Sequence, residues 1–199
     1  MEQILKKTII DSIDVKNKML DPKYLKPLYE LGKTMVSSII KGGKIMLCGN
    51  GGSAADAQHL AAEFLVRLRP KINRNPLPAI ALAQDTSTIT ACGNDFGFEK
   101  LFERNLIAIG RRGDILICIS TSGKSENIKL AAQACNQNGI YCFGFLGNDG
   151  GTVKDFCNNY IIIPSNNTAR IQEAHITIGH AVMEYVETEL LKKEIIKLN

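Results

Sequence analysis

The chain alternates short apolar runs with longer stretches of helical periodicity between residues 44 and 164, and this alternation most narrows its possible folds. Five runs read as buried strands: 44–48 (KIMLC), 77–83 (LPAIALA), 114–120 (DILICIS), 140–146 (IYCFGFL) and 160–164 (YIIIP). The helical stretches between them cover 53–68, 86–109, 124–138 and 150–157. Strands alternating with helices favour a parallel sheet covered on both faces. The prediction is an α/β fold, a three-layer α/β/α sandwich with a mostly parallel five-stranded sheet.

Both ends of the chain read as helical extensions of this sandwich. Residues 1–42 contain no strand-like run, and Asp21 followed by Pro22 is typical of a helix start. Residues from about 168 to 198 form one long amphipathic pattern. We therefore predict a single domain over 1–199. Its extensions need a place to bury their apolar faces, which favours a homo-oligomer.

Composition excludes several classes of protein. No segment approaches the ~20 apolar residues of a membrane span, and the N-terminus lacks the apolar core of a signal peptide. The six cysteines form no C-x-x-C pair, which favours buried, reduced thiols in the cytoplasm. With 6% aromatic residues and no Trp, a stacking platform for nucleic acid is not expected. The net charge of +4 suits a small anionic substrate.

Two loops rich in Gly and Ser follow predicted strands. The first is GNGGSA (49–54) and the second is STSGKSEN (120–127). Ligands of open α/β sheets bind beyond the carboxyl ends of the strands, and hydroxyls beside free N–H groups at a helix start can hold an anion. An ordinary N-cap would need only one or two hydroxyls. The second loop offers four, so we predict a phosphate site there.

A nucleotide is the alternative ligand for the first loop, because Gly49, Gly51 and Ala54 fit the pattern G-x-G-x-x-G/A. A dinucleotide site needs an acidic residue about 20 residues further on. Here the next strand-like run ends near Asp85, 31 residues after Ala54. The loop also lacks the G-K-[ST] ending of a P-loop. Both observations disfavour a nucleotide.

Histidines and one glutamate are the candidates for acid–base or metal chemistry. His59 and Glu63 are four residues apart and share one helical face, either as a site or as a simple surface pair. His180 has small and apolar neighbours, so we expect it to face a buried region or an interface. A hydrogen-bonded core histidine is the other interpretation. No motif surrounds His175, and we interpret it as structural.

Four segments together resemble the bacterial phosphoheptose isomerases of the sugar isomerase (SIS) domain superfamily. They are GNGGSAADAQHLAAE (49–63), GNDFGFE (93–99), STSGKSENI (120–128) and RIQEAHITIGH (170–180). The resemblance covers nearly the whole chain and implies a single SIS domain. It also implies a cytoplasmic homotetramer with active sites at subunit interfaces. The implied reaction converts sedoheptulose 7-phosphate to D-glycero-D-manno-heptose 7-phosphate, toward lipopolysaccharide or capsule.

The same resemblance implies the roles of individual residues. Glu63 and His180 would be the catalytic acid–base pair. One zinc ion per subunit would be held by His59, Glu63, Gln172 and His180. The substrate would contact Asn50, Gly51, Gly52, Ser53, Glu63, Asn94, Asp95 and Gln172, and its phosphate would bind Ser120, Thr121, Ser122 and Ser125.

Helix geometry limits this metal site. Gln172 and His180 lie eight residues apart, so a straight helix separates their Cα atoms by about 12 Å and turns them by roughly 80°. Both reach one ion only if both side chains extend toward it. A glutamate bound tightly to zinc is also a poor base, so the zinc is either weakly held or structural to the site.

Two rival functions belong to the same superfamily. One is a non-catalytic relative that binds a replication initiator protein. Such relatives keep the Gly/Ser loops but lose the acidic residue at the position of Glu63 and the histidine at that of His180, and this sequence has both. The other is an isomerase of a different sugar phosphate, because no residue here measures the length of the sugar.

Overall fold

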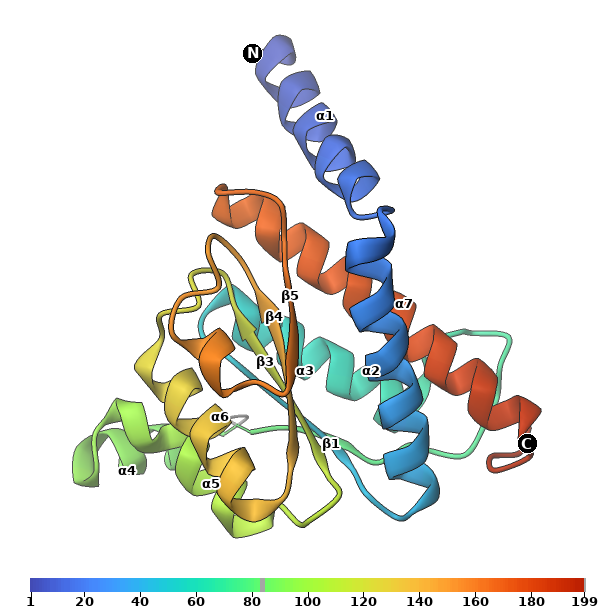
Figure 1. Ribbon diagram of the computed structural model, residues 1–199, viewed down its shortest axis with the longest axis vertical. Helices are drawn as coiled ribbons and strands as arrows, with labels where there is room; N and C mark the ends of the chain where they lie inside the picture. Colours follow the sequence, from blue (N-terminus) through green and yellow to red (C-terminus); the bar gives the residue numbers. More distant parts are fainter. Residues whose placement is uncertain (83–84, 199) are drawn as a thin grey trace.

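A computed structural model describes residues 1–82 and 85–198 and contains a five-stranded sheet in the order β2-β1-β3-β4-β5. All neighbouring strands are parallel. The strands are β1 (Ile45–Gly49), β2 (Ala79–Ala81), β3 (Ile115–Ser120), β4 (Tyr141–Leu146) and β5 (Asn159–Ile162). The predicted α/β/α sandwich is confirmed (Figure 1). Ala83 of the predicted strand 77–83, and Asn199 at the chain end, lie outside the described residues.

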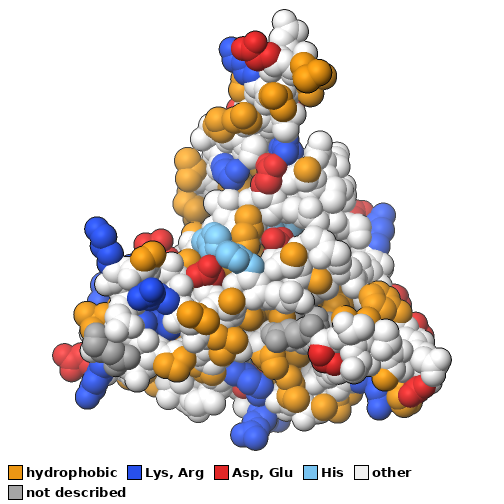
Figure 2. All heavy atoms as spheres, turned by 180° about the vertical axis from the view of Figure 1, so that it is seen from behind, with side chains coloured by type: hydrophobic (Ala, Val, Ile, Leu, Met, Phe, Trp, Pro, Cys, Tyr) orange, Lys and Arg blue, Asp and Glu red, His pale blue; other side chains and the backbone are white. Residues whose placement is uncertain are grey.

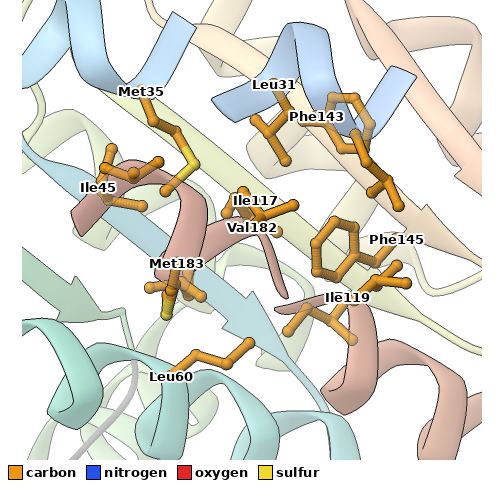
Figure 3. Packing of buried hydrophobic residues seen from close by; sticks show 14 of the residues in the cluster. Leu31, Met35, Ile45, Leu60, Ile117, Ile119, Phe143, Phe145, Val182 and Met183 are labelled. Carbon is orange, nitrogen blue, oxygen red and sulfur yellow. The ribbon is translucent and has the colours of Figure 1, made fainter. Parts of the chain in front are cut away.

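Side chains of each strand alternate between two apolar layers. Ile115, Ile117 and Ile119 of β3 point to one face, where α2 (Pro22–Ile40), α3 (Gly52–Ala62) and α7 (Thr168–Lys192) pack (Figure 3). The intervening residues of β3 point to the other face, which α5 (Leu101–Ile109) and α6 (Glu126–Asn138) cover. Because both faces are buried, the strands read as continuous apolar runs in the sequence.

Three predicted helices differ from those observed. The stretch 86–109 is interrupted, because Gly97 takes a φ of +91° between α4 (Thr86–Asp95) and a short 3₁₀ turn that leads into α5. The helix predicted over 53–68 ends as α3 at Ala62 and continues as a π-helical segment, η1 (Glu63–Arg67). Only a 3₁₀ turn, η3 (Val153–Phe156), forms in the stretch 150–157.

The terminal extensions are helical. Asp21 caps α2 by accepting a hydrogen bond of 2.9 Å from the backbone N–H of Lys23. The long C-terminal helix, α7, ends at Lys192, short of residue 198. Figure 1 shows α1 (Glu2–Lys18) projecting from the body of the molecule. Its exposed apolar side chains are Ile4, Leu5, Ile9, Ile10 and Ile13.

All six cysteines are free, and five of them are buried. Desolvation by the surrounding apolar layer raises the pKa of the Cys48 thiol well above its ordinary value. This agrees with the prediction of buried, reduced thiols. Within the described ranges, no helix combines the length and the apolar character that crossing a bilayer requires.

Candidate active site

The two Gly/Ser loops lie side by side, because β1 and β3 are neighbouring parallel strands. Asn50 of the first loop and Asn127 at the start of α6 exchange two amide hydrogen bonds, each of 2.9 Å. Asn127 is 3% exposed. This reciprocal pair ties the loops together and occupies the Asn50 amide, which was predicted to contact substrate.

Two hydroxyl groups of the second loop accept hydrogen bonds from the loop itself, and a third makes no capping hydrogen bond. The buried Ser120 accepts a 3.0 Å hydrogen bond from the N–H of Gly123, which closes the loop. Ser122 accepts one of 3.2 Å from the N–H of Lys124. Ser125 is the N-cap residue of α6, yet its side chain makes no capping hydrogen bond. The hydroxyl and N–H groups at this helix start remain able to bind an anion.

Helices α3 and α7 pack closely and in the same direction, which brings the predicted residues into one strip. Gln172 lies against Gly52, so that a Cβ built on Gly52 would come 2.5 Å from the Gln172 amide nitrogen. Gly179 lies against the buried Leu60, where an added Cβ would come 2.6 Å from a Leu60 methyl carbon. The absence of a side chain at Gly179 therefore lets the two helices approach beside His59 and His180.

His59, Glu63 and His180 form a cluster at the far end of this strip. His59 Nε2 lies 2.9 Å from His180 Nε2 and 3.3 Å from Glu63 Oε1. The Glu63 side chain is 18% exposed and that of His59 is 50% exposed. Figure 2 shows histidine atoms beside acidic atoms on this face. Desolvation raises the pKa of the nearby Asp56 carboxyl, and the charge of His59 opposes that rise.

The donor atoms of this cluster suit zinc. They lie within 4.8 Å of one another, the only such group of His, Cys, Asp and Glu among the residues that the structure describes. Ligand distances of about 2.0–2.1 Å in a tetrahedral site place donor atoms roughly 3.3 Å apart. The observed separations of 2.9 and 3.3 Å are close to that value. Three protein ligands would leave a position open for substrate.

Three predicted site residues lie apart from this cluster within one subunit. Gln172 sits at Gly52, and about 10 Å of helix separates Gly52 from His59. Asn94 and Asp95 lie exposed at the end of α4, where the Asn94 amide donates a 2.7 Å hydrogen bond to Asp95. Figure 1 places α4 at the edge of the molecule, away from α3 and α7. Their roles stay predictions.

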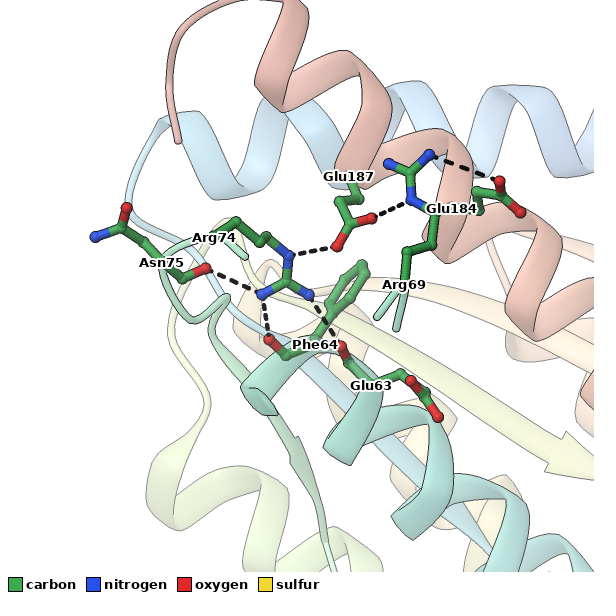
Figure 4. A network of polar contacts seen from close by, with 7 residues as sticks. All are labelled: Glu63, Phe64, Arg69, Arg74, Asn75, Glu184 and Glu187. Carbon is green, nitrogen blue, oxygen red and sulfur yellow. Dashed lines mark hydrogen bonds and ion pairs between the residues drawn. The ribbon is translucent and has the colours of Figure 1, made fainter. Parts of the chain in front are cut away.

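Sequence reasoning missed three buried polar residues that shape the site. Asn127 pairs with Asn50, and Arg74 forms an ion pair with Glu187 beside Glu63 (Figure 4). Asn127 belongs to the second Gly/Ser loop, but no local pattern distinguishes it from its polar neighbours there. Arg74 and Glu187 are 113 residues apart, so no local pattern links them.

His175, interpreted from the sequence as structural, is fully buried in α7. Its Nε2 lies 3.2 Å from the carbonyl oxygen of Leu146, and its ring stacks on Phe145. Burial lowers the pKa of His175 to about 4, because the charged form is not solvated. The structural interpretation of His175 agrees with these contacts.

Protonation of His175 is expected to make stability fall as pH falls. Below pH 6.5 the unfolded chain takes up a proton on this histidine, whereas the folded chain does so only near pH 4. The stabilisation is complete above pH 6.5 and is lost as pH falls toward 4, by about 2 kcal/mol at pH 5. Urea unfolding at pH 7.5 and pH 5 measures it. His175→Gln, which keeps an N–H donor, should show a smaller difference between the two pH values. An equal difference would show that His175 does not cause it.

Known proteins resemble this chain over most of its length. Residues 11–147 match the SIS domain family. The phosphoheptose isomerase of Clostridium acetobutylicum is 46% identical over 196 residues, which cover 98% of this chain and 99% of that protein. The corresponding protein of Roseiflexus sp. is 47% identical over 182 residues, covering 92% and 91%. The structure of phosphoheptose isomerase from Neisseria gonorrhoeae aligns with a TM-score of 0.87 at 36% identity, covering 94% of this chain and 98% of that one.

Proposed function

The chain belongs to the phosphoheptose isomerases of the SIS domain family, and we propose that it converts sedoheptulose 7-phosphate into D-glycero-D-manno-heptose 7-phosphate with Glu63 and His180 as its acid–base pair. The observation that carries this assignment is the contact of His59, Glu63 and His180, where the end of α3 and the start of η1 meet α7. It places a carboxylate and an imidazole in one partly exposed site. The heptose phosphate would feed lipopolysaccharide or capsule synthesis.

An aldose–ketose isomerisation moves one proton between neighbouring carbons. Glu63 removes the proton from C1 of the ketose, which gives an enediol, and returns it to C2. His180 moves a proton between the two oxygens of that enediol. Both roles need positioned groups that can accept a proton and return it, and carboxylates and imidazoles serve as such general acids and bases.

The phosphate binds at the other end of the α3–α7 strip. The hydroxyls of Thr121, Ser122 and Ser125 and the N–H groups at the start of α6 receive it. About 10 Å along α3 separates Gly52 from His59, a distance that an extended seven-carbon sugar phosphate can span. Binding energy from the phosphate then orients the reacting carbons at Glu63.

Zinc is the cofactor that these residues would hold. His59, Glu63 and His180 supply the nitrogen and oxygen ligands that zinc takes. When bound, the ion would polarise the sugar oxygens as a Lewis acid. Gln172 would join this set only from a position other than the one that it occupies against Gly52.

A cytoplasmic homotetramer completes the proposal. The exposed apolar side chains of α1 offer a surface for a second copy of the chain. Assembly would also let Asn94 and Asp95 of one subunit reach a site in another, as the family resemblance implies. Free cysteines agree with a reducing compartment. Light scattering after size-exclusion chromatography checks the tetramer, and a monomer at micromolar concentration contradicts it.

Turnover of sedoheptulose 7-phosphate by the purified protein tests the function, with the product identified by NMR. The assay is run as purified, after chelation, and after zinc is restored. We expect turnover that chelation lowers and zinc recovers. If turnover does not depend on metal, the acid–base roles of Glu63 and His180 stand and zinc is removed from the proposal. No turnover in any arm would overturn the proposed substrate, and other sugar phosphates would be assayed next.

A further inference from the structure

Arg74 and Glu187 form a fully buried ion pair beside the proposed catalytic residues, and the mechanism above does not use it. Both side chains are 0% exposed, and Arg74 Nε lies 2.5 Å from Glu187 Oε1 (Figure 4). We propose that this pair positions Glu63 relative to His180, so that Arg74 and Glu187 are positioning residues for the isomerisation. This inference rests on the proposed function, because it assigns these residues to the same site.

Arg74 holds the backbone of Glu63 directly. Its Nη2 donates a 2.9 Å hydrogen bond to the carbonyl oxygen of Glu63, and its Nη1 donates one of 3.0 Å to that of Phe64. These carbonyls lie where α3 changes into the π-helical η1, an irregular backbone that needs added hydrogen-bond donors. The guanidinium donates to three carbonyls, that of Asn75 included, and to the Glu187 carboxylate. These four hydrogen bonds exceed the three donors of an ammonium group.

Glu187 connects this guanidinium to the helix that carries His180. The two residues are seven apart on α7, so they lie on nearly the same face, about 10 Å apart along the axis. The second carboxylate oxygen of Glu187 accepts a 2.5 Å hydrogen bond from Arg69, which follows η1. Two arginines from the segment after Glu63 therefore bind the same carboxylate on α7, that of Glu187.

The Arg74–Glu187 ion pair restricts the orientation of two segments that already pack closely. Leu60 against Gly179 sets the distance between the helices, whereas the Arg74–Glu187 bonds resist sliding of η1 along α7. Buried ion pairs are often no more stabilising than apolar residues of the same volume. Their oriented bonds nevertheless fix geometry, and a misplacement of 1 Å in a reacting group costs about 100-fold in rate.

The double variant Arg74→Met/Glu187→Met separates positioning from stability, because it leaves neither charge buried alone. Arg69 keeps Glu184, whose carboxylate lies 3.6 Å away. We expect kcat to fall by about 10- to 100-fold while KM for sedoheptulose 7-phosphate stays within a factor of two. Arg74→Lys keeps the charge but not the fork of donors, and its kcat should be intermediate.

Asp114→Asn is the matched control. Asp114 is 2% exposed, and its carboxylate binds the Lys44 ammonium and accepts a hydrogen bond from the N–H of Arg111. It precedes β3, at the end of the sheet away from the two Gly/Ser loops. Loss of this carboxylate should lower the urea concentration at the midpoint of unfolding and leave kcat unchanged. Wild-type kcat in the double variant or in Arg74→Lys would overturn the inference, and so would an equal loss of kcat in Asp114→Asn. If the double variant does not fold, Arg74→Lys decides. An inactive wild-type enzyme would instead overturn the proposed function.

Discussion

Replacing Glu63 by Gln is expected to lower kcat by about 10²- to 10⁴-fold, the range that a positioned acid–base group contributes. The amide has nearly the volume of the carboxylate but cannot accept the carbon-bound proton. Because the Glu63 side chain is 18% exposed and pairs with the half-exposed His59, the fold should survive. Initial rates at saturating sedoheptulose 7-phosphate measure the effect, and thermal unfolding checks that the variant is folded.

Two further variants make the result specific to Glu63. Glu184 lies on the same helix as His180, and its exposed carboxylate pairs with Arg69. The variant Glu184→Gln should keep the wild-type kcat. His59→Gln removes a proposed zinc ligand but not the proposed base. Added zinc should recover part of the activity of His59→Gln and none of that of Glu63→Gln. A Glu63→Gln enzyme with near-normal kcat would remove Glu63 from the mechanism.

Gly123→Ala is expected to raise KM for the sugar phosphate by about 100-fold, the loss of one or two hydrogen bonds to a charged group. Gly123 has a φ of +65°, and an added Cβ would come 2.0 Å from the carbonyl oxygen of Gly150. The loop must then move away from the neighbouring turn. That movement displaces the N–H and hydroxyl groups that would hold the phosphate. Steady-state kinetics measures KM and kcat separately.

Gly42→Ala controls for backbone strain in this experiment. Gly42 also has a positive φ, of +82°, but among the described residues other than its chain neighbours no atom lies within 4 Å of an added Cβ. It should lose some stability and keep its KM. Ser122→Ala, which removes one hydroxyl without a steric clash, should raise KM by about tenfold. An unchanged KM in both Gly123→Ala and Ser122→Ala would place the phosphate elsewhere.

Much of the site follows from local sequence. Apolar runs precede Gly49 and Ser120, and these runs predict parallel strands. The carboxyl ends of parallel strands lie at the same edge of the sheet. The two Gly/Ser loops can therefore be placed together from these runs alone. His59 and Glu63 can be paired in the same way, because four residues make about one helical turn.

Contacts between distant segments could not be predicted in this way. The approach of His59 to His180 depends on Gly179 lying against Leu60, and a glycine inside a helix has no local pattern that indicates such a contact. Gln172 lies on the same helix as His180, yet the structure separates it from the His59 cluster and sets it on Gly52. The irregular η1 segment at Glu63 also interrupts a pattern that reads as plain helix.

Local sequence specifies the succession of strands and helices along the chain, the two Gly/Ser loops and the residue types of the proposed site, because each depends on neighbours within a few turns. Which helices share a face, and which charges are buried, depends instead on how distant segments pack. Arg74 reads in the sequence as a loop cation and Glu187 as a polar residue of an amphipathic helix. They become a buried pair because the packing of distant segments excludes water around them, a result that no short segment specifies.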